Sequence, residues 1–161
     1  MARFIDTNIF VACLRGRADH VREKFLHHPP AEILVPFQVL AELKLGAAKS
    51  ARPEHHTLQV ANILRPFAIA WPDVAAVEHY VDIRGTLEKE GNVISQADLW
   101  IASITRAAGG ILVPNNSDEF SRVPGLMLVS RNPAVGTLPT VPDDPPSAIL
   151  SSLRIRRIFT P

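Results

Sequence analysis

Short apolar runs alternate with stretches of helical periodicity over most of this chain. Uninterrupted apolar runs are typical of strands that are covered on both faces, as in a parallel sheet. They occur at residues 4–5, 33–35, 67–69, 111–113 and, more weakly, 126–129. The pattern therefore predicts an α/β domain in which helices cover both faces of a central, mainly parallel sheet.

Proline, glycine and small polar residues mark the ends of the intervening helices. Pro36 suits the first turn of one helix, and a long helix capped by Asp73 ends at Gly91, the usual C-terminal glycine. The expected helices span residues 9–17, 18–27, 37–48, 54–64, 73–91 and 95–110. Strands and helices together predict a three-layer α/β/α fold.

The chain has 161 residues, of which 47% are hydrophobic, enough for one well-buried core. We expect a single domain over residues 1–129. After about Ser130 the segment RNPAVGTLPTVPDDPPSAIL is rich in proline and shows neither helical nor alternating period. Residues 130–161 are therefore expected to form a tail outside the core, largely disordered or loosely attached.

Charge and cysteine content exclude several classes of protein. The net charge is +1, so the chain lacks the broad positive field of a nonspecific nucleic-acid coat, and any contact with nucleic acid must be local. Cys13 is the only cysteine, which excludes an intramolecular disulfide and fits a reducing cytoplasm. We expect a cytoplasmic protein, because no apolar run approaches the roughly 18 residues that span a bilayer.

Three acidic residues stand in apolar surroundings. Asp6 closes the first strand in FIDTNIF, Glu42 lies among apolar neighbours in its helix, and Asp98 precedes an apolar run near the start of another helix. Each alone has an ordinary explanation: a helix cap, an exposed helix residue and a first-turn acid. Together they are costly unless a cation binds them, because ionised carboxylates amid apolar side chains are strongly disfavoured.

A fourth polar cluster follows the strand at 111–113, in the sequence ILVPNNSDEF, with Asn115, Asn116, Asp118 and Glu119. It reads equally as a loop of turn-forming residues. Oxygen ligands of this kind suit Mg²⁺ or Mn²⁺. Zinc is disfavoured, because the adjacent pairs His27-His28 and His55-His56 point apart on a helix.

Four segments resemble the signatures of PIN-domain ribonucleases, specifically the VapC toxins of bacterial toxin–antitoxin modules. In chain order they are FIDTNIF, VLAELKLGAAKSARPE, IRGTLEKEGNVISQADLWIA and ILVPNNSDEFSRVPGL. The resemblance covers about residues 3–128. It implies a PIN-like fold and a Mg²⁺- or Mn²⁺-dependent endoribonuclease that cleaves RNA, with tRNA as one possible substrate.

The same resemblance implies roles for individual residues. The catalytic acids would be Asp6, Glu42, Asp98 and Glu119, with Asp6 and Asp98 holding the metal directly. Supporting polar groups would be Thr7, Asn8 and Asn116. Lys44, Lys49 and Arg52 are candidates for a basic rim that contacts RNA, and Arg84 either stabilises the site or lies on a solvated helix face. A small antitoxin protein and a second copy of the chain would be partners, with no membrane involved.

Pro114 departs from the pattern, because the family usually has threonine before the paired asparagines. The loss of that hydroxyl, together with the unusual tail, motivates an alternative: a catalytically weak or inactive PIN-fold module that binds RNA or a protein. A phosphoryl-transfer signalling domain with a phosphorylated Asp6 is a third interpretation. That interpretation lacks a clear lysine at a later strand end to contact the phosphate.

Overall fold

The computed structural model describes residues 1–16, 28–114 and 117–129. Residues Met1–Val129 form one compact unit. The helix expected over 18–27, the residues Asn115 and Asn116, and the tail expected over 130–161 lie outside the described residues, so these expectations stay predictions. No helix in the described ranges is long and apolar enough to cross a membrane.

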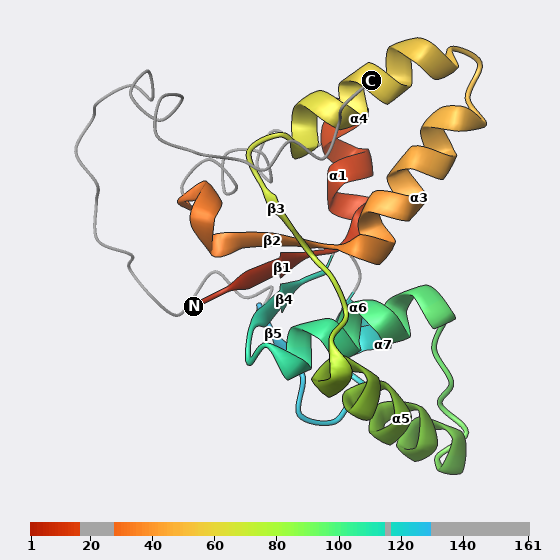
Figure 1. The fold of residues 1–161 in the computed structure, drawn as a ribbon. Coiled ribbons are helices and arrows are strands. Elements are labelled where there is room, and N and C mark those ends of the chain that lie inside the picture. Colours follow the sequence, from red (N-terminus) through yellow and green to blue (C-terminus); the bar gives the residue numbers. More distant parts are fainter. Residues whose placement is uncertain (17–27, 115–116, 130–161) are drawn as a thin grey trace. The chain divides into compact units, whose positions relative to one another are not determined.

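The centre of the unit is a five-stranded sheet in the order β3-β2-β1-β4-β5, with every neighbouring pair parallel (Figure 1). The strands are β1 (Arg3–Ile5), β2 (Ile33–Pro36), β3 (Ala68–Ala70), β4 (Ile111–Val113) and β5 (Met127–Leu128). The apolar runs thus predicted every strand of this sheet. β2 extends one residue further than predicted, because Pro36 still pairs with Ala70 before the chain turns into a helix.

Helices cover both faces of the sheet, as the three-layer prediction required. In Figure 1, α1, α3 and α4 lie on one face, and α5 and α6 lie on the other. The helices are α1 (Thr7–Leu14), α3 (Phe37–Ala48), α4 (Pro53–Leu64), α5 (Val74–Lys89), α6 (Gln96–Ala107) and α7 (Ser117–Phe120), with a single 3₁₀ turn, η1 (Pro30–Glu32). The short helix α7 occupies part of the segment for which a loop of turn-forming residues was one of the interpretations left open.

The core forms where apolar residues of the strands meet one face of each helix. Phe4 and Val35 are fully buried in the sheet, and Val39 and Leu43 of α3 pack on one side of it. On the other side α6 is buried over most of its circumference, from Leu99 to Thr105. The inner position of α6 explains its long apolar run, because a helix between a sheet and another helix meets apolar neighbours on several sides.

The register of the strands brings their carboxyl ends to one level. Phe4 pairs with Leu34, so Asp6, two residues later, stands level with Pro36, which in turn pairs with Ala70. On the other side Ile5 pairs with Val113. The residues that follow β3, β2, β1 and β4 therefore lie along a single edge, which is where open α/β sheets bind ligands.

Candidate active site at the carboxyl edge of the sheet

Asp6 ends β1 and is buried, with 4% of its surface exposed. Its backbone N–H donates to the carbonyl of Val113 at 3.2 Å, and its carbonyl accepts from Ile9 in the first turn of α1. Although that turn is fully described, no N–H in it donates to the Asp6 carboxylate. Side-chain capping of α1 therefore does not account for the buried position of Asp6.

Glu42 reaches the same edge from the neighbouring helix. It lies half-buried in α3, next to the inward-facing Leu43. The hydroxyl of Thr7, the first residue of α1, donates a hydrogen bond to Oε2 of Glu42. Since Thr7 directly follows Asp6, this bond holds the Glu42 carboxylate beside the end of β1. Asn8, the next residue, is exposed.

Asp98 is fixed by the residue that begins its helix. The Ser95 hydroxyl accepts a hydrogen bond from the Asp98 backbone N–H at 3.1 Å and donates one to Oδ2 of Asp98 at 2.6 Å. Ser95 is the N-cap of α6, so the cap that starts the helix also orients the carboxylate. Asp98 additionally lies in the first turn, where the helix dipole favours a negative charge.

Glu119 lies in α7, just after β4, and shares its environment with the other acids. A hydrogen bond from the protonated Glu119 to Asp98 and the negative charge of Asp98 raise the pKa of Glu119, an exposed residue, above its ordinary value. Burial and the charge of Asp6 raise this pKa further, whereas the Arg122 charge lowers it. Such a hydrogen bond requires a proton on one of the two carboxyl groups. Asp6, Asp98 and Glu119 therefore interact, although they are widely separated in the sequence.

The chemistry of this group fits a hard divalent cation. Every charged donor in it is a carboxylate oxygen, the ligand that Mg²⁺ and Mn²⁺ prefer. In the described ranges no group of three or more His, Cys, Asp or Glu residues is arranged to hold a metal ion. What supports a cation at this edge is the electrostatic interaction of Glu119 with Asp98 and Asp6.

The other predicted residues lie further from the acids or outside the described residues. Lys44 is exposed on α3, Lys49 is exposed at the C-cap of α3, and Arg52 is exposed at the N-cap of α4. Lys49 and Arg52 flank the turn between these helices, at the end of α3 opposite to Thr7. Arg84 pairs with Glu88 one turn further along α5, which favours the solvated helix face over a contact with the site. Asn116 is outside the described residues.

Two residues of this edge were not predicted as parts of the site. Ser95 was interpreted only as the beginning of a helix, although the spacing of Ser95 and Asp98 is that of a capping pair. Arg122 was not considered at all. It follows Glu119 by three residues, about one helical turn, and this spacing was the available signal.

A parallel sheet that gathers carboxylates from β1, α3, α6 and α7 at one edge defines an α/β domain with an acidic, oxygen-donor site. The sequence model of the PIN domain family matches residues 3–126. The chain belongs to this family, and within it to the VapC-type PIN-domain ribonucleases. The fold and the resemblance predicted from the sequence are thereby confirmed.

Relatives of this chain are VapC proteins of several bacteria. It is 33% identical over 122 residues to the tRNA(fMet)-specific endonuclease VapC of Shigella flexneri, covering 76% of this chain and 92% of that protein. It is 33% identical over 129 residues to the ribonuclease VapC2 of Rickettsia felis, covering 80% and 96%. Among solved structures, VapBC2 from Rickettsia felis bound to a promoter DNA fragment has a TM-score of 0.76 at 30% identity, covering 80% of this chain and 98% of the other.

Proposed function

We propose that this chain is a Mg²⁺- or Mn²⁺-dependent endoribonuclease and the toxin of a toxin–antitoxin pair. The observation that carries the proposal is the electrostatic link among Asp6, Asp98 and Glu119 at the carboxyl edge of the sheet. Mutual repulsion of these acids is the condition that a divalent cation relieves. The names of the relatives, which are ribonucleases and endonucleases, support RNA as the substrate.

The proposed mechanism assigns each acid a task. Asp6 and Asp98 hold the cation, and the Ser95 hydroxyl keeps the Asp98 carboxylate in position. When bound, the cation activates water and offsets negative charge on the phosphate. Glu119, which lies next to Asp98, would accept a proton from the attacking water.

The remaining polar groups shape the same edge. Glu42, held by Thr7, adds a further oxygen donor that orients water beside the end of β1. Arg122 supplies a positive charge next to Glu119 and is available to the substrate phosphate. Lys44, Lys49 and Arg52 form the outer basic rim along α3 and the start of α4, where they would contact the RNA backbone.

The proposed partners are a small antitoxin and a second copy of the chain. Solved structures of similar fold include VapBC2 from Rickettsia felis bound to a promoter DNA fragment and DNA-bound VapBC from Salmonella typhimurium. By analogy an antitoxin would bind this chain and block the acidic edge. The tRNA specificity named for the Shigella flexneri relative makes tRNA the first substrate to test.

The decisive experiment combines cleavage with metal binding. The purified chain should cut tRNA in Mg²⁺ or Mn²⁺ and lose this activity in a chelator. The variants Asp6→Asn and Asp98→Asn should each lose at least about 10³-fold in rate, whereas Glu78→Gln at an exposed position of α5 serves as a control with unchanged cleavage. Mn²⁺ should raise the melting temperature of the wild type more than that of Asp6→Asn. A folded wild type that leaves total RNA and tRNA intact would contradict the proposal.

Pro114 supports a second candidate, a PIN-fold module that binds RNA or a protein without cutting. Pro114 directly follows β4 and supplies no hydroxyl at this edge. Under this candidate Mn²⁺ leaves the melting temperature unchanged and RNA binds without cleavage. The variant Pro114→Thr tests it further, since restoring the hydroxyl should then create or increase metal-dependent cleavage.

A further inference from the structure

An exposed tryptophan stands at the same sheet edge as the acids. Trp71 directly follows β3, and 60% of its surface is exposed. Its ring stacks on Phe37, with the centroids 5.9 Å apart and the planes inclined by 20°. Large aromatic side chains usually bury most of their surface. An indole that is stacked on another ring and largely open to solvent is therefore a candidate binding surface.

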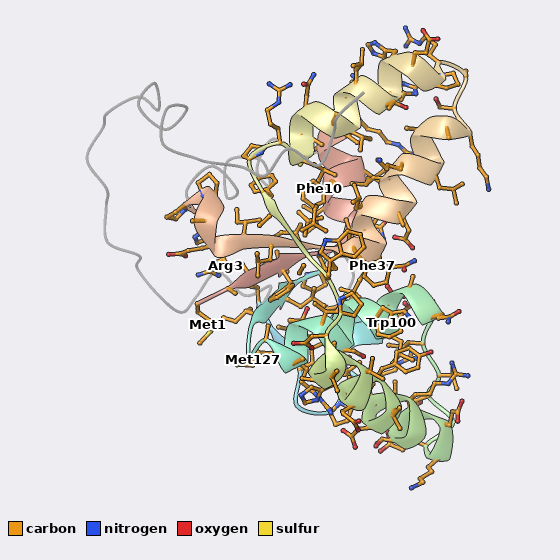
Figure 2. All side chains as sticks on the ribbon, viewed as in Figure 1. Met1, Arg3, Phe10, Phe37, Trp100 and Met127 are labelled. Atoms are coloured by element: carbon orange, nitrogen blue, oxygen red, sulfur yellow. The ribbon has the colours of Figure 1, made fainter. Side chains whose placement is uncertain are left out.

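Trp71 belongs to a row of aromatic rings that continues inward. The rings of Phe37 and Trp100 pack edge to face with their centroids 6.1 Å apart, and the ring centroids of Trp100 and Tyr80 of α5 are 4.5 Å apart. Figure 2 shows Phe37 and Trp100 between the start of α3 and α6, at the carboxyl end of the sheet. The inner members fix the outer one, so the orientation of Trp71 is set before any ligand arrives.

The aromatic row and the acids are carried by the same elements. Phe37 and Glu42 both lie in α3, and Trp100 follows Asp98 by two residues in α6. Strand pairing sets Ala70, and hence Trp71, within one residue of the level of Asp6. Neighbouring strands lie about 4.8 Å apart, so β3 and β1, two strands apart, place these residues on the order of 10 Å from each other along the edge.

We propose that Trp71, supported by Phe37, is the stacking site for a base of single-stranded RNA whose neighbouring phosphodiester lies at the acids. This inference rests on the proposed ribonuclease function. Single-stranded RNA combines a backbone phosphate with a flat apolar base at a short, fixed separation, which matches an acidic site flanked by an exposed indole. Stacking on an aromatic ring is tolerant of sequence, so the site contributes affinity more than base specificity.

The low net charge of the chain favours a stacked RNA base as the ligand of Trp71. At +1, the protein lacks a strong positive field to retain RNA by its phosphates alone. A stacked base adds binding that does not depend on salt. The contribution of Trp71 should therefore remain at salt concentrations that weaken the contacts of Lys44, Lys49 and Arg52.

The test compares Trp71→Ala and Trp71→Phe with Leu58→Ala, an equally exposed apolar residue on α4 (66%). The probe is a fluorescein-labelled single-stranded RNA with 2′-O-methyl groups, which resists cleavage. Trp71→Ala should weaken binding about 10- to 100-fold, with Trp71→Phe retaining most of the affinity and Leu58→Ala unchanged. On cleavable RNA the same change should raise KM and leave kcat within about threefold.

An abasic strand of the same length isolates the contact with the base. The wild type should bind the base-bearing strand more tightly than the abasic strand, by the same factor by which Trp71→Ala weakens binding of the base-bearing strand. Trp71→Ala should bind the two strands with nearly equal affinity. If wild type and Trp71→Ala bind the RNA equally and have equal KM values, the inference is overturned. The proposed function is judged separately, by whether the wild type cleaves RNA. A change of oligomeric state in Trp71→Ala with RNA affinity intact would also overturn the inference, and would assign Trp71 and the exposed Val74, Val77 and Val81 to an interface between copies.

Discussion

The hydroxyl of Ser95 accepts a hydrogen bond from the Asp98 N–H and donates one to the Asp98 carboxylate. One side chain thus begins α6 and orients a site acid. Asp73 performs only the first of these tasks, because it caps α5 by accepting from the Ala76 N–H at 2.8 Å and is not one of the grouped acids. A comparison of the two caps therefore distinguishes an effect on helix stability from an effect on the position of a site acid.

Replacing each cap by alanine should cost a similar amount of stability and different amounts of activity. Ser95→Ala and Asp73→Ala should each lower the free energy of unfolding by about 1 kcal/mol, measured by urea denaturation. Only Ser95→Ala should also slow RNA cleavage, by about 10-fold or more, because Asp98 loses its donor. Equal cleavage rates in the two variants would show that Ser95 does not position Asp98.

The raised pKa of Glu119 predicts a stability that falls as pH rises. Between its unfolded value near 4.5 and its higher folded value, the folded chain binds more protons than the unfolded chain. Stability is therefore lost across this window and stays lower above it. Without divalent metal, Glu119→Gln should melt at a higher temperature than wild type at pH 7, and the difference should vanish below about pH 4.

Two controls keep the Glu119 prediction specific. Glu90→Gln, an exposed position at the end of α5, should leave the melting temperature unchanged across the same pH range. Adding Mn²⁺ should reverse the order of the two proteins, since only the wild type then keeps its full set of carboxylates. A Glu119→Gln protein that is less stable than wild type at pH 7 in a chelator would contradict the assigned repulsion.

The bond from Thr7 to Glu42 predicts a graded response at one position. Thr7→Ser keeps the hydroxyl and should cleave RNA at nearly the wild-type rate. Thr7→Val keeps the shape and removes the donor, so it should destabilise the fold by about 1 kcal/mol and lower cleavage about 10-fold. Initial rates and thermal denaturation of the pair measure both effects. Equal RNA cleavage rates in Thr7→Ser and Thr7→Val would show that the Thr7 hydroxyl does not position Glu42.

The sequence predicted the strands because a strand that is buried on both faces has a local signature. An apolar run such as Ile111–Val113 predicts a buried strand wherever it lies, and the carboxyl ends of parallel strands share one edge. The prediction that Asp6 and Asp98 share one site rested on the cost of isolated carboxylates in apolar surroundings and on the family resemblance. The prediction for Glu119 rested on family resemblance, since its segment also read as a loop.

Contacts between distant segments could not be predicted in the same way. The hydrogen bond from Thr7 to Glu42 joins residues 35 positions apart, and nothing in either local sequence specifies it. Trp71 was not singled out, because nothing in its local sequence indicates an exposed ring. Its exposure depends on where α5 and α3 lie, which is a property of the packed structure.

Gly110 and Gly46 predict opposite effects for one substitution. A Cβ added at Gly110, just before β4, would lie 2.4 and 2.7 Å from ring atoms of Phe4, which is fully buried and cannot give way. Gly110→Ala should therefore destabilise the fold by about 1 to 3 kcal/mol through overpacking. Gly46, inside α3, has nothing within 4 Å of the same added atom, so Gly46→Ala should stabilise by up to about 1 kcal/mol. Urea denaturation measures both changes, and a Gly110→Ala protein as stable as wild type would show that Phe4 is packed differently against β4.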